Sequence, residues 1–282
     1  MREKGRKRKK WLIVLTAFLF FAALVFGSLC IGLQYKLRHW EYWSPDYEKI
    51  DISLLLDKET RSEEDYKVLY SQTGLTKIGI DGTLAQEGGR EKVLKIQEYY
   101  FRGPTRDGRY ASPIMYMDET SSYATLAALQ DGDVLVTATT IVAWWRFGHS
   151  ALVVDASGGR VLESIGMGSD SKYNSTSVFT NLANFMVLRP KAEAETKVQV
   201  VEYAKENLVG LPYVFTVGIL SKKNPKKIKY TQCAHLVWYA YKQFGIDLDS
   251  DGGALVLPQD LANSSHLELV QTFGFHPERL WK

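Results

Sequence analysis

Cysteine is scarce in this chain, which has only Cys30 and Cys233 among its 282 residues. Two cysteines cannot form the disulfide framework that stabilises many small secreted domains. The sequence also lacks a phosphate-binding loop, a zinc-ligand pattern and a calcium loop. We therefore expect no metal and no cofactor. Internal repeats and low-complexity linkers are absent as well.

A strong excess of one charge is confined to the N-terminus. Met1–Lys10 carries seven basic residues and one acidic residue, a net charge of +6, whereas the whole chain is +3. The rest of the chain is therefore −3, and the basic pI of 8.6 comes from the tail. This distribution predicts no nucleic-acid partner. A composition of 45% hydrophobic and 24% charged residues is typical of a folded protein.

Residues 11–33 follow the basic tail and contain no charge. About 20 apolar residues suffice to span a bilayer as a helix, and basic flanks stay on the cytoplasmic side. The pattern predicts a cytoplasmic tail at 1–10, a transmembrane helix at 11–33 and a cell-membrane protein whose C-terminal part lies outside the cytoplasm. A cleaved signal peptide is the rival interpretation, but the run is long and lacks an A-x-A-like exit.

The remaining chain divides into two regions. Residues 34–125 are predicted to be a helical extracytoplasmic region, with helices beginning near Ser62 and spanning 89–101. Residues 126–282 are predicted to form an α+β domain, because strands precede helices. The strands are predicted at 134–136, 150–154, 161–165 and 185–189, and the helices at 196–208 and 231–244.

Cys233 lies at the start of the last helix. Thr231 is a plausible N-cap, which would place the thiol in the first turn, where backbone N–H groups and the helix dipole stabilise an anion. His149 directly follows Gly148 at the start of a predicted strand, and a histidine facing a helix N-terminus is the arrangement of Cys–His catalysis. The alternative is that Cys233 is a core residue on an apolar helix.

Two segments resemble the NlpC/P60 cysteine-peptidase signature: Gly210–Phe215, with its Gly-x-Pro-Tyr order, and Thr231–Tyr241, in which the cysteine opens a helix. Gly148–Val154 resembles the histidine strand of that family. Here the histidine precedes the cysteine, as in the circularly permuted branch that includes the YiiX/YebB-like hydrolases and the lecithin:retinol acyltransferase relatives. The resemblance covers about residues 130–265 and implies a papain-like fold.

The resemblance also implies roles for individual residues. Glu163, on the strand after His149, is expected to orient the imidazole. A tight hairpin would place Glu163 opposite Val154, too far from His149, so a bulge, strong twist or different register is required. The residues expected to contact substrate are Tyr213, which lines the nucleophile pocket in the family, and Gln232, where the family commonly has Asp. Trp145, with Trp144 beside it, lies four residues before His149, and this position makes it either a substrate-groove residue or a stacked core aromatic.

These features predict a membrane-anchored thiol hydrolase that cleaves amide or ester bonds through Cys233, His149 and Glu163, with cell-wall peptides as one candidate substrate. A lipid or N-acyl hydrolase or acyltransferase is the first alternative. A non-catalytic envelope-binding protein that keeps the fold is the second. The lysine-rich run 222–229 is either a solvated loop or a segment attracted to anionic lipid heads or wall polymers.

Overall fold

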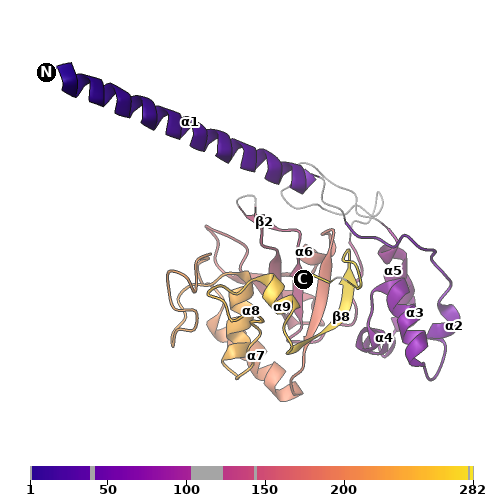
Figure 1. The fold of residues 1–282 in the computed structure, drawn as a ribbon. Helices are drawn as coiled ribbons and strands as arrows, with labels where there is room; N and C mark the ends of the chain where they lie inside the picture. The colour runs from indigo at the N-terminus through magenta and orange to yellow at the C-terminus, as the bar shows by residue number, and fades with distance from the viewer. Residues whose placement is uncertain (1, 39–41, 103–122, 143–144, 279, 282) are drawn as a thin grey trace. The chain divides into compact units, whose positions relative to one another are not determined.

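A computed structural model of the chain describes residues 2–38, 42–102, 123–142, 145–278, 280 and 281 (Figure 1). It comprises two compact units. The first contains the N-terminal helix, and the second contains most of the described residues from Tyr42 onward. The predicted region 34–125 lies only partly within the description, because residues 39–41 and 103–122 fall outside it.

The N-terminal helix α1 spans Arg2–Arg38. Within it, Lys10–Gly32 is 23 residues long with a mean hydropathy of 2.6, enough in length and composition to cross a membrane. This confirms an apolar helix at the predicted position to within one residue at each end.

The second unit is built on a six-stranded antiparallel sheet with the order β6-β5-β4-β1-β7-β8. The strands are β1 (Val134–Thr137), β4 (His149–Asp155), β5 (Arg160–Glu163), β6 (Lys172–Ser175), β7 (Phe185–Pro190) and β8 (Leu267–Phe273). A separate two-stranded ribbon pairs β2 (Ile141–Val142) with β3 (Trp145–Arg146). The α+β class and the four predicted strands are confirmed, whereas β6 and β8 were not predicted.

The helices of this unit are α2 (Ser53–Leu56), α3 (Glu63–Thr73), α4 (Lys77–Leu84), α5 (Gly89–Tyr100), α6 (Ser177–Thr180), α7 (Ala194–Asn207), α8 (Cys233–Lys242) and α9 (Pro258–Ala262). Ser62 and Asp65 form a capping box at the start of α3, and Gly74 ends that helix in the left-handed conformation. These contacts explain why the predicted helix begins and ends where it does.

One hydrophobic core joins the helices α3–α5 to the sheet. Leu69, Ile80 and Val93 of these helices cluster with buried strand residues such as Val153 and Val187. Figure 1 shows the three helices together beside β8. Gly79 permits the close approach, because a Cβ there would lie 2.3 Å from the carbonyl oxygen of Val270. The N-terminal helices therefore share their apolar interior with the sheet.

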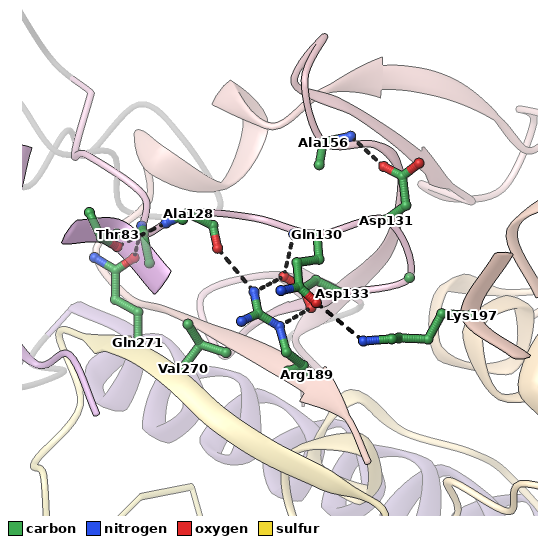
Figure 2. Close-up of polar contacts among 12 residues, drawn as sticks. Thr83, Ala128, Gln130, Asp131, Asp133, Ala156, Arg189, Lys197, Val270 and Gln271 are labelled. Atoms are coloured by element: carbon green, nitrogen blue, oxygen red, sulfur yellow. Dashed lines mark hydrogen bonds and ion pairs between the residues drawn. The ribbon is translucent and has the colours of Figure 1, made fainter. Parts of the chain in front are cut away.

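A buried ion pair anchors the segment that leads into the sheet (Figure 2). Arg189 Nη2 lies 2.8 Å from Asp133 Oδ2, and its Nε donates to Asp133 Oδ1 at 2.9 Å. The same guanidinium donates to the carbonyl oxygen of Ala128 at 3.0 Å. Burial raises the pKa of Asp133, and the Arg189 charge opposes that rise. The strand entry thus depends on a charge pair whose partners are both removed from water.

A second set of contacts fixes the residues just before this pair. Gln271 on β8 accepts from the N–H of Ala127 and donates to the carbonyl oxygen of Thr125. Thr83 on α4 accepts from the N–H of Ala128 at 3.1 Å. Figure 2 shows these contacts converging from a helix and a strand far apart in the sequence. The backbone groups of the buried segment are thereby paired.

We expect Arg189→Ala to lower the free energy of unfolding by about 3–5 kcal/mol, because Asp133 would remain buried without its partner. Chemical denaturation of the full chain in detergent measures the loss. Lys67→Ala is the control, since it breaks the exposed pair with Glu64 and should leave the transition unchanged. Equal effects of the two substitutions would contradict this account.

Candidate active site

Helix α8 presents Cys233 at its first position. The N-cap is Gln232, whose side-chain Oε1 accepts from the N–H of Ala234 at 2.8 Å. The prediction of Thr231 as N-cap is therefore wrong. The Thr231 hydroxyl lies 2.9 Å from Nδ1 of His235 and donates to the carbonyl oxygen of Gln232, so it is used elsewhere. The longer glutamine side chain folds back to cap the helix instead.

The thiol itself is buried and has a polar neighbour. Cys233 is 7% exposed, and its Sγ donates to Gln232 Oε1 at 3.2 Å. The Gln232 amide is held from its other end, because Nε2 donates to the carbonyl oxygen of Val256. Both ends of the amide are engaged within the protein, which leaves Gln232 as a cap and thiol partner.

His149 opens β4 and is paired with Glu163. His149 Nε2 lies 2.6 Å from Glu163 Oε2, and the two residues are 8% and 1% exposed. Gly148 precedes the histidine with φ +74°, and a Cβ there would lie 2.4 Å from the carbonyl oxygen of Thr137. Only glycine suits this position, so the chain can turn tightly into the strand that carries His149.

A β-bulge brings Glu163 into reach of His149. The register pairs Val153 with Val161 but Asp155 with Arg160, so β4 has one extra residue at Val154. The hairpin is also wider than expected, because Asp155 pairs with Arg160. The wider turn and the bulge together place Glu163 opposite Ala151, two residues from His149, and the expectation that it lies opposite Val154 is wrong. Residues two apart share a face of the sheet, and diagonal side chains can touch. Of the three possibilities that the spacing left open, the structure has both a bulge and a different register.

The charges of this cluster favour a protonated imidazole. Burial alone would lower the pKa of His149, but hydrogen bonding and charge from Cys233 and Glu163 outweigh burial and raise it well above its usual range. Burial likewise raises the pKa of Glu163, but His149 and Asn174 outweigh it and hold the carboxyl below its ordinary value. With Nε2 directed at Glu163, Nδ1 is the ring nitrogen available to the thiol. Cys233, His149 and Glu163 are thus brought together.

Neighbouring aromatic rings complete the site. The ring of Phe179 on α6 stacks on His149 with centroids 5.5 Å apart and an interplanar angle of 14°. Tyr213 is half-buried, and burial together with the charge of Cys233 raises its pKa. The phenol therefore stays neutral near the thiol and can donate a hydrogen bond. The Trp145 backbone belongs to β3, but its side chain and all of Trp144 lie outside the described residues.

Two polar residues near the site were not predicted to contribute to it. Asn174 on β6 donates from Nδ2 to Glu163 Oε1 at 2.7 Å; β6 carries little apolar alternation, so no sequence pattern indicated it. The second is His235 on α8, whose Nε2 lies 2.7 Å from the carbonyl oxygen of Lys223. His235 thus ties α8 to the lysine-rich run 222–229.

An acidic cluster lies apart from these residues. Carboxylate oxygens of Asp249, Asp251 and Asp260 lie within 4.8 Å of one another. Lys223 already pairs with Asp249, and Asp260 accepts from the N–H of Leu257 at the start of α9. A protein cation and a helix cap therefore account for two of the three acids, and we assign no metal to them.

His235 makes the stability of the fold sensitive to acid. Burial lowers its pKa to about 4 from an ordinary 6.5, so the native state binds fewer protons than the unfolded state between these values. The resulting stability is complete above pH 6.5 and is lost as the pH falls toward 4, by on the order of 3 kcal/mol. Denaturant titration of the wild type and His235→Gln should show their difference in unfolding free energy shrinking over this range.

The exposed His266 provides the control, because His266→Gln should follow the wild type at every pH. A difference between wild type and His235→Gln that stays constant from pH 7 to pH 4 would show that His235 is not held neutral by the fold.

No family model matches this chain, and neither the search of curated proteins nor that of solved structures found a match.

Proposed function

We propose that this protein is a thiol hydrolase of the circularly permuted, papain-like NlpC/P60 kind, anchored by α1 with its second unit outside the cytoplasm. The observation that carries the proposal is the buried cluster of Cys233, His149 and Glu163. A nucleophile, a base and a group that orients the base are the minimal parts of such a site. The basic residues at the start of α1, which precede its apolar stretch, support the orientation.

In the proposed reaction His149 removes the proton from the thiol of Cys233, and Sγ attacks the carbonyl carbon of an amide or ester. The tetrahedral intermediate collapses as the bond to the leaving group breaks, and His149 returns the proton to that group. A water, deprotonated by His149, then attacks the thioester and releases the acid and the free thiol. Glu163 keeps Nδ1 directed at the reaction and stabilises the imidazolium.

The oxyanion would be held at the start of α8. The Cys233 N–H occupies the first helical position and has no partner within the helix, whereas the next N–H is already taken by Gln232 Oε1. The neutral Tyr213 hydroxyl, which is near enough to Cys233 to feel its charge, is proposed as a second donor. One backbone donor and one phenol thus constitute the proposed oxyanion hole.

Substrates are amides or esters reachable from the outer membrane face, and cell-wall peptides are one class. The Gln232 amide is engaged with Val256 and α8 rather than free, which weakens its expected role as a substrate contact. A second class, lipid or N-acyl compounds, is supported by Ile219 and Leu220, which are 55% and 80% exposed just before the lysine-rich run. The membrane anchor suits either class.

An electrophilic thiol probe at neutral pH tests the nucleophile. We expect labelling at Cys233, with its loss in Cys233→Ala and a reduction of at least about 100-fold in His149→Ala, because the base would be missing. Cys30→Ser is the matched control and should label like the wild type. If Cys233 of the folded wild type is not labelled, the enzyme proposal fails and the non-catalytic envelope-binding protein is the alternative that remains.

Product analysis on purified cell wall and on lipid vesicles separates the two substrate classes. We expect one of them to be cleaved by the wild type and by Cys30→Ser but not by Cys233→Ala. Cleavage that survives Cys233→Ala would overturn the proposed mechanism.

A further inference from the structure

Both oxygens of the Glu163 carboxylate have protein partners. Oε2 lies 2.6 Å from His149 Nε2, and Oε1 accepts from Asn174 Nδ2 at 2.7 Å. The Glu163 side chain is 2% exposed, and a carboxylate so removed from water remains charged only if donors replace its hydration. We propose that Asn174 is a positioning residue that keeps the Glu163 carboxylate charged and turned toward His149, an inference that rests on the proposed function.

The amide of Asn174 can face Glu163 in only one way. Its Oδ1 accepts from the N–H of Ser175 at 2.9 Å, which directs the NH₂ group at the carboxylate. The hydrogen bond therefore runs from Asn174 to Glu163. Such a donor stabilises the ionised carboxylate and withholds Oε1 from other partners, so that Oε2 is left for the imidazole.

The sheet register explains why a residue of β6 can reach Glu163. Glu163 pairs with Lys172, and Val161 pairs with Asn174, so Asn174 is the diagonal neighbour of Glu163 on the edge strand. On its other side, Glu163 reaches His149 across the bulged pairing with β4. Three adjacent strands thus contribute histidine, carboxylate and amide in a row that ends at the thiol.

The charged and titratable groups around this row are few among the described residues. On β6, Lys172 faces Glu163, but its side chain is exposed and its effect is weakened by water. His149 is faced by Glu163 and by Cys233 of α8, and Tyr213 lies close to that thiol. Asn174 is itself uncharged, so replacing it by alanine changes the titration of Glu163 without changing the net charge of the protein.

The experiment follows alkylation of Cys233 by iodoacetamide from pH 4 to pH 9 in the full chain carrying Cys30→Ser. In Asn174→Ala the carboxylate loses a donor, so Glu163 protonates at higher pH and supports the imidazolium less well. We expect the acid limb of the rate profile to move up by roughly one pH unit, a tenfold loss of rate below the midpoint. Asn174→Asp keeps the size but opposes two carboxylates, and should move the limb further.

Tyr173→Phe is the matched control, because Tyr173 neighbours Asn174 on β6 with its side chain on the other face, and its profile should coincide with that of the parent. In a Glu163→Gln background, Asn174→Ala should have no additional effect, since Asn174 acts through Glu163. Circular dichroism and melting of each variant confirm that it is folded.

The outcomes separate the two proposals. If alkylation of the parent is slow and does not depend on His149, the proposal that Cys233 is the nucleophile is overturned, and the role of Asn174 with it. A parent profile that depends on His149 and Glu163, but is unchanged by both Asn174→Ala and Asn174→Asp, would overturn the Asn174 inference alone. An equal effect of Asn174→Ala with and without Glu163→Gln would also overturn it, because a purely structural bond between strands predicts that result.

Discussion

The single extra residue at Val154 governs the geometry of the proposed site. Without it, regular antiparallel pairing from Asp155 and Arg160 would set Glu163 opposite Leu152, on the other face of the sheet from His149. With it, the carboxylate lies diagonally across from the imidazole, at 2.6 Å between Nε2 and Oε2. The contact of Asn174 with Glu163 comes instead from the regular pairing of β5 with β6. The irregularity in β4 aligns the histidine with the carboxylate, and the regular β5–β6 pairing adds the amide.

The thiol is positioned by a different part of the fold. Gln232 caps α8, accepts from the Cys233 thiol and is held in turn by Val256. The Cys233 thiol is therefore buried between two hydrogen-bond partners. Its proton can be accepted by Gln232 or by the neighbouring His149. In the proposed reaction, transfer of the thiol proton to His149 would replace a neutral contact by an ion pair, and the Glu163 charge would stabilise the imidazolium.

The buried polar groups of the segment that enters the sheet have hydrogen-bond or ion-pair partners. Asp133 and Arg189 are both removed from water, yet the guanidinium spans the carboxylate and a backbone carbonyl. Gln271 similarly serves two backbone groups of the segment that enters the sheet. These contacts join the N-terminal helices, the entry segment and β8 around one core, which holds β1 and hence its neighbour β4 in place.

The sequence by itself determined the apolar N-terminal helix, the α+β class, the placement of Cys233 in the first turn of a helix and the placement of His149 at a strand start, because charge and hydrophobic periodicity are local properties. Tertiary structure alone decided the bulge at Val154, the choice of Gln232 over Thr231 as cap, and the approach of Asn174 to Glu163. These three features depend on how separate segments of the chain pair and on which backbone groups lack partners. Such properties cannot be read from one stretch of residues.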